Sequence, residues 1–316
     1  MCLGLFSILT ACQHDPKIPA KIAAIDVEID IERFDSAFAN TAPEELPDLK
    51  AKYPYMFAQQ YEDAYWEEKL SDTLQNELET AVLNSFPDMD DEQQAISQLY
   101  QHIKYYFPET SIPKVITITS EVDYRNKVFL TDSLLFIALD TYLGSDHHFY
   151  GGIPKYHSKN FRPTQIDVDI ASAFAKAHTS RPRQPHFLAQ MIYEGKQLYL
   201  MDALLTAKAQ HELFGYTEAE YQFAEENQKN MWEYFVASEL LYKTDRNLLT
   251  RFIDPAPFSK FYLSIDNDSP SMIGKFIGWK IVKSFMKVNS SSLNELIQYD
   301  PMYIYNNSKY KPSNYE

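Results

Sequence analysis

The sequence predicts an α+β fold, a predominantly helical single domain with a small β-sheet. Two observations indicate this class. Apolar residues recur at three- and four-residue steps through residues 42–107 and again from residue 162 onward, as in helices packed on a core. Between these regions, residues 113–144 are rich in the β-branched and aromatic side chains that strands favour. With 316 residues, 45% of them apolar, the chain can bury the core of one such domain.

The N-terminus carries the pattern of a bacterial lipoprotein signal. Residues 3–9 form an apolar run too short to span a bilayer, and LTAC at 9–12 fits the lipobox that precedes an acylated cysteine. The pattern departs from the usual signal because no Lys or Arg precedes the apolar run. We predict that residues 1–11 are a signal peptide that is removed, that Cys12 carries the lipid, and that residues 12–23 form a lipidated tether.

Residues 24–316 are expected to fold as the single domain, and it begins with a strand. In AIDVEIDIERF (24–34), apolar and acidic residues alternate at period two, which is typical of a half-buried strand. Helices are expected through residues 42–107, with Asp88 or Asp90 capping the last of them.

The next segment is expected to supply the rest of the sheet. PKVITITSEV (113–122) forms one strand, and residues 128–144 form either one strand or two that bend at Thr131-Asp132. The loop GSDHHFYGGIP (144–154) follows, with three glycines, a proline and two adjacent histidines. It is the first segment to suggest a functional site.

Four further segments have helical spacing, at 163–178, 185–205, 217–244 and 269–287. The third is predicted to bury an apolar stripe that includes Trp232, Val236, Leu240 and Tyr242. In the fourth, Gly274 and Gly278 lie one turn apart, and we expect them to admit the close approach of another helix or strand.

Composition excludes several functions. A formal charge of −15 argues against nucleic acid binding, which needs clustered Lys and Arg. The chain lacks the glycine-rich signatures of nucleotide sites and the G-x-S-x-G elbow of hydrolases. Cys2 and Cys12 are the whole cysteine inventory, which leaves none for a disulfide or a zinc site in the body of the chain. No cofactor is predicted.

Some acidic and histidine side chains are candidate metal ligands. Asp146, His147 and His148 are consecutive in the loop after the last strand, with Asp140 six residues before Asp146, and such a set suits zinc or another transition ion. A hydrogen-bonded turn is the alternative interpretation. Glu194 and Asp202 are spaced about two helical turns apart, which allows either joint acid–base work or ordinary structural pairing.

Several strings together resemble the GldB type of gliding-motility-associated lipoprotein of Bacteroidetes. The strings are ERFDSAF (32–38), TYLGSDHHFY (141–150), MIYEGKQLYLMDALL (191–205), GYTEAEYQFAEENQKNMWEYFVASELLY (215–242), PAPFSKFYLSIDNDSP (255–270), IGKFIGWKIVKSFM (273–286) and NSKYKP (307–312). The resemblance implies a lipoprotein of the outer membrane, facing the periplasm and linked to the gliding and type IX secretion apparatus. It carries no established catalytic activity with it.

A fainter similarity connects residues 187–205 and 273–286 with the second half of putative zinc peptidases. It implies a degenerate zincin-like scaffold, in which Glu194 matches a metal ligand. The upstream helix expected at 165–178 lacks the H-E-x-x-H that the chemistry needs.

The sequence as a whole predicts a non-enzymatic, lipid-anchored accessory protein that binds or stabilises other gliding and secretion proteins of the envelope. One alternative is a metal-dependent, peptidase-like hydrolase built on Asp146, His147, His148 and Glu194. The other is a module that binds cell-wall glycans through exposed Tyr and Trp.

Overall fold

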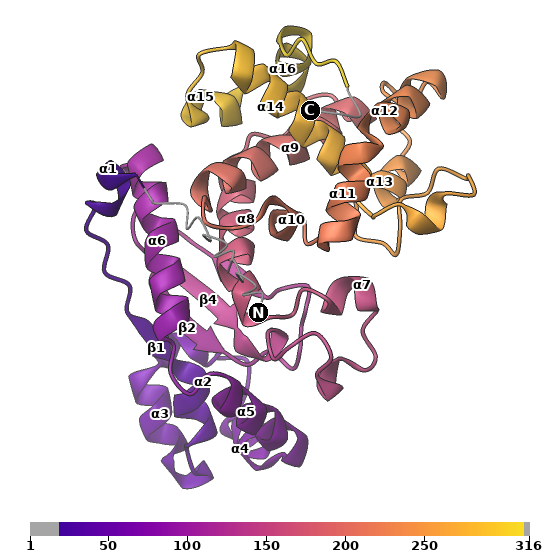
Figure 1. Ribbon diagram of the computed structural model, residues 1–316. Coiled ribbons are helices and arrows are strands. Elements are labelled where there is room, and N and C mark those ends of the chain that lie inside the picture. Colours follow the sequence, from indigo (N-terminus) through magenta and orange to yellow (C-terminus); the bar gives the residue numbers. More distant parts are fainter. Residues whose placement is uncertain (1–18, 313–316) are drawn as a thin grey trace, which may run out of the picture.

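The computed structural model describes residues 19–312 (Figure 1). Cys12 and the predicted signal peptide lie outside the described residues. The strands are β1 (Ile31–Arg33), β2 (Lys114–Ile118), β3 (Val128–Leu130) and β4 (Leu134–Ala138). The longer helices are α4 (Asp63–Ser71), α5 (Thr73–Ser85), α6 (Asp90–Tyr106), α8 (Ile166–His178), α9 (Phe187–Leu204), α11 (Glu218–Glu226), α12 (Gln228–Ala237) and α14 (Ile273–Val288). The shorter helices are α1 (Ala20–Ala23), α2 (Phe34–Ala39), α3 (Leu46–Lys52), α7 (Lys155–Ser158), α10 (Gln210–Leu213), α13 (Asn247–Phe252), α15 (Leu293–Gln298) and α16 (Pro301–Asn307).

The sheet has four strands in the order β1-β2-β4-β3. β1, β2 and β4 are parallel, and β3 pairs with β4 in the antiparallel sense. The segment 128–144 therefore contains two strands that turn back at Thr131-Asp132, which was one of the two alternatives. The small sheet among many helices confirms the predicted α+β class.

Both faces of the sheet are covered by helices. Successive side chains along a strand point to opposite faces, so each strand contributes to two separate clusters. On one face, Val115, Leu135 and Ile137 join the large core, which also takes residues from α6, α8, α9 and α14. On the other face, Ile116 packs in a smaller aromatic cluster with Phe34 and others from α2, α3 and α4. Figure 1 shows these helices and α5 gathered at the lower end of the molecule, with α9 and α14 at the upper end.

The predicted strand at 24–34 is mostly wrong, since only Ile31–Arg33 pairs in the sheet. The residues before it are fastened by side chains of α6. Gln93 Nε2 donates to the carbonyl oxygen of Ile29 at 2.6 Å, and Gln101 Nε2 donates to that of Ile25 at 3.0 Å. Residues 20–23, within the segment predicted as tether, form α1 and pack against α6.

The long helix predicted at 217–244 is two helices, α11 and α12, that meet at Asn227. The predicted apolar stripe is buried only in part, because Val236 is 49% exposed and Tyr242 is 61% exposed. At the start of α6 the N-cap is Met89, and the Asp88 carboxylate only accepts a 3.4 Å bond from the backbone N–H of Asp90.

The close approach predicted for the last long helix is confirmed at Gly278. A Cβ placed there would lie 1.8 Å from the carbonyl oxygen of Met191, on α9. The contact is reciprocal, because a Cβ on Gly195 of α9 would lie 2.2 Å from the carbonyl carbon of Gly278. α9 and α14 therefore cross backbone to backbone at the centre of the large core. Within residues 19–312, every helix is too short or too polar to span a bilayer.

Candidate functional site

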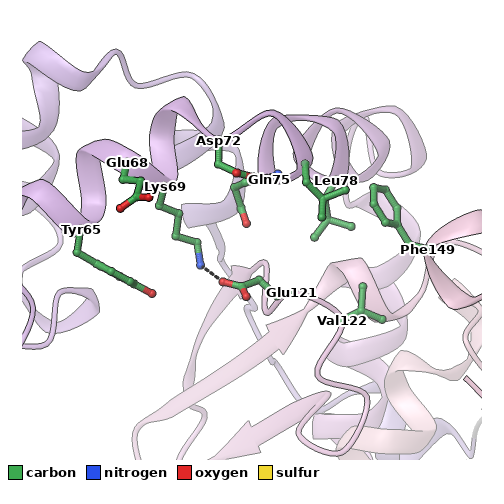
Figure 2. Close-up of a pocket in the computed structure, with 10 residues that line it drawn as sticks. Tyr65, Glu68, Lys69, Asp72, Gln75, Leu78, Glu121, Val122 and Phe149 are labelled. Atoms are coloured by element: carbon green, nitrogen blue, oxygen red, sulfur yellow. Dashed lines mark hydrogen bonds and ion pairs between the residues drawn. The ribbon is translucent and has the colours of Figure 1, made fainter. Parts of the chain in front are cut away.

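A groove with a volume of about 640 Å³ opens at the carboxyl ends of the parallel strands β2 and β4 (Figure 2). This edge of an open α/β sheet is where ligands generally bind, because loops from several strands converge there. The groove is lined by Tyr65, Glu68, Lys69, Asp72, Leu74, Gln75, Leu78, Glu121, Val122 and Phe149. α4 and α5 supply one wall, and the loops after β2 and β4 supply the other.

The helical wall is shaped by Asp72, which ends α4 and begins α5. Its Oδ1 accepts the backbone N–H of Gln75 at 2.7 Å, so the carboxylate caps the first turn of α5. Figure 2 shows Tyr65 and Lys69 pointing from α4 toward the opposite loop, where Lys69 Nζ forms an ion pair with Glu121 at 2.8 Å.

The opposite wall is a strained turn held by one buried carboxylate. Glu121 and Val122 have φ angles of 56° and 59°, which β-branched valine rarely adopts. Asp140, fully buried after β4, accepts the backbone N–H groups of Ser120 at 3.0 Å and Val122 at 2.6 Å. Burial raises the pKa of Asp140, and these donors act in the opposite direction. The carboxylate thus holds the turn in the shape that forms the groove.

We expect Asp140→Asn to loosen this turn, because the amide NH₂ cannot accept the N–H bonds that a carboxylate oxygen accepts. The expected loss is about 1 kcal/mol of unfolding free energy. The more direct measurement is hydrogen exchange, in which the Ser120 and Val122 amides should exchange about fivefold faster, the factor that corresponds to this loss. Asp268→Asn, at an exposed aspartate of the short 3-10 helix Asp266–Asp268, is the control. Unchanged exchange at Ser120 and Val122 would contradict the assignment.

A second layer of polar side chains lies behind the α5 wall. Gln75 Nε2 donates to Glu79 Oε1 at 2.5 Å and to Thr119 Oγ1 at 3.2 Å. Burial raises the pKa of Glu79, while the bond from Gln75 lowers it. This layer fixes the side chain of Gln75 at the groove.

A partly buried ion pair lies at the end of β1. Arg33 donates from Nε to Asp35 Oδ1 at 2.9 Å and from Nη2 to Oδ2 at 2.7 Å, a bidentate geometry. The Thr117 hydroxyl of β2 also donates to Asp35. The side chains of the ERFD string therefore tie β1, α2 and β2 together.

The loop at residues 144–154, called here the histidine loop, contributes to the groove through Phe149. Asp146 is 84% exposed and pairs with Lys155 at 2.5 Å, which lowers the pKa of Asp146. His148 Nε2 lies 3.2 Å from Glu77 Oε1 of α5. His147 accepts the backbone N–H of Phe149 at 3.5 Å, and burial, with the neighbouring His148, lowers the pKa of His147. The three candidate ligands thus have separate partners.

The two acidic candidates on α9 also have separate surroundings. Glu194 pairs with Lys275 of α14 at 3.1 Å and accepts a 2.9 Å bond from Gln190. Burial raises the pKa of Asp202, and the charge of Lys283 on α14 opposes that shift. Within residues 19–312, no three His, Cys, Asp or Glu side chains are placed to hold a metal ion together. The structure does not assemble Asp146, His147, His148 and Glu194 into one site.

Comparison with protein families gave a match over residues 15–312 to the family described as gliding motility protein GldB. Searches of curated proteins and of solved structures found no match.

Proposed function

This chain belongs to the family of gliding motility protein GldB, and we propose that it is a lipid-anchored accessory protein that binds or stabilises other envelope components of the gliding and type IX secretion apparatus. The family match over residues 15–312 is the observation that carries the proposal, because it spans nearly the whole chain. Membership of the family implies a part in gliding motility.

The lipobox supports the anchoring part of the proposal. Acylation of Cys12 would add several chains at the first mature residue, and several chains attach a protein durably where one is marginal. The anchored chain would face the periplasm from the outer membrane.

The groove supports binding as the role of the domain. Each buried carboxylate around it is held by structural partners: Asp140 by backbone N–H groups, Glu79 by Gln75, and Asp35 by Arg33. The surface that remains open combines an apolar floor with exposed charges, which suits contact with another macromolecule.

The anchor is tested by feeding cells an alkyne fatty acid and probing the purified chain for label. We expect label on wild type and on Cys2→Ser, whose altered residue lies in the removed peptide, and none on Cys12→Ser. Label that persists in Cys12→Ser, or that is absent from wild type, would refute the anchor.

The role is tested in the native organism by deleting the gene and restoring variants. Deletion should abolish gliding on agar, wild type and Cys2→Ser should restore it, and Cys12→Ser should fail to do so. A deletion strain that glides normally would refute the assigned function.

A further inference from the structure

The groove carries a net negative charge. Among the described residues that line it, Glu68, Asp72 and Glu121 are acidic and Lys69 is basic. The lysine is already paired with Glu121, so the charge left over on the walls is negative. Glu121 is 67% exposed, which leaves its carboxylate accessible to a second cation.

The groove also exposes apolar side chains to solvent. Leu74, in the first turn of α5, is 63% exposed, and Tyr65 of α4 is 40% exposed. At one end of the groove, the partly exposed Phe149 and Val122 lie near Leu78, which is itself only 4% exposed (Figure 2). An apolar side chain of a ligand would therefore find contacts on both walls.

Both walls are held in place before any ligand arrives. Asp140 holds the strained turn at Glu121 and Val122, and Asp72 caps α5. A surface that is already ordered loses less conformational entropy on binding, so more of the contact energy appears as affinity. The cost of the strained backbone at Val122 is also explained if the turn serves recognition.

We propose that this groove binds an extended segment of a partner protein that presents Lys or Arg beside an apolar side chain. The proposal rests on the function proposed above and adds the surface and the chemistry of its partner. The cation of the partner lies against the exposed carboxylates of the walls, Glu68 and Glu121, and its apolar side chain packs against Leu74 and Phe149. Charge complementarity selects this occupant over an acidic or neutral segment.

The test measures binding of a fluorescent probe peptide, Lys-Leu-Lys-Phe-Lys with blocked ends, to the purified full chain in detergent. A second probe, Glu-Leu-Glu-Phe-Glu, has the same apolar residues with opposite charge. The groove variant is Glu68→Lys with Glu121→Lys. Its matched control, Glu218→Lys with Glu226→Lys, makes the same change of net charge on exposed residues of α11.

The cationic probe should bind wild type and the control within twofold of each other, and bind the groove variant at least tenfold more weakly. Added salt should weaken the binding, and the acidic probe should not bind. Equal losses in the two variants would show diffuse attraction to an acidic surface, and would overturn the proposal. Absence of binding by the cationic probe, or equal binding by the acidic probe, would overturn it too.

The outcome separates this inference from the function on which it rests. If the probe fails to bind the groove while deletion of the gene still abolishes gliding, the inference falls and the function stands. If the deletion strain glides normally, the function falls whatever the probe does.

Discussion

Replacing Gly278 with alanine is expected to prevent stable folding. The added Cβ would lie 1.8 Å from the carbonyl oxygen and 2.4 Å from the carbonyl carbon of Met191, well inside van der Waals contact. The obstacle is helix backbone, so no side-chain rotation relieves it, and α14 must move away from α9. These two helices meet in the large core, where separation opens cavities around buried residues such as Trp279 and Ile277. The expected loss exceeds about 4 kcal/mol, a large part of the stability of an ordinary domain.

Soluble yield and thermal unfolding followed by circular dichroism measure this effect. Gly152→Ala is the matched control, because a Cβ there meets nothing within 4 Å. We expect the control to unfold like wild type and Gly278→Ala to be insoluble or to melt far lower. Gly195→Ala, on the other side of the same crossing, should behave like Gly278→Ala. A Gly278→Ala protein that melts within a few degrees of wild type would contradict the crossing.

This crossing shows how far the sequence alone could go. The spacing of Gly274 and Gly278 indicated that something approaches the last long helix closely. It did not indicate which element approaches. The partner is the helix around Gly195, and a single glycine in a helical segment does not by itself predict a close contact. Contacts between segments more than 80 residues apart depend on the packing of the whole core, so a local sequence pattern does not predict them.

The strands at residues 114–118 and on either side of Thr131-Asp132 were predictable from composition, because these segments are rich in β-branched and aromatic side chains. The segment 24–30 was predicted as a strand from its period-two alternation, yet its carbonyl groups accept bonds from Gln93 and Gln101 of α6 instead of a neighbouring strand. Alternation indicates that one side of a segment is buried. It does not indicate which groups form hydrogen bonds with the backbone of that segment.

The candidate site was predictable only in part. The histidine loop attracted attention for its histidines, but its side chain in the groove is Phe149. The turn at Glu121 and Val122 contains no glycine to signal positive φ, so only the structure reveals it. The buried Asp140 that holds the turn is 18 residues or more from it in the sequence, and its place before the loop at 144–154 suggested a metal ligand and not a partner of backbone N–H groups.

The second large expected effect is a pH dependence of stability, and it arises from Lys196, a buried lysine next to Gly195. Lys196 is fully buried, and its Nζ donates to the carbonyl oxygens of Ile297 and Tyr299, each at 3.0 Å. These carbonyls lie at the C-terminal end of α15, where a cation is favourable. Burial nevertheless lowers the pKa of Lys196 to about 8, from 10.5, and the charge of Asp300 only partly offsets it. The charged form is therefore less stable in the folded chain than in water.

The unfolding free energy should consequently rise with pH over the range in which Lys196 is deprotonated in the folded chain and still protonated in the unfolded chain. Below pH 8 both states hold the proton, and between about pH 8 and 10.5 the unfolded state binds more protons. From pH 7 to 9.5, the unfolding free energy of wild type should therefore increase by about 2 kcal/mol relative to that of Lys196→Met. Taking the difference between the two proteins cancels the tyrosines, which also begin to titrate there. Urea unfolding at each pH measures this difference, with Lys176→Met, an exposed lysine of α8, as the control. Parallel pH profiles for wild type and Lys196→Met would contradict the assignment, because a lysine with an ordinary pKa contributes no slope below pH 9.5.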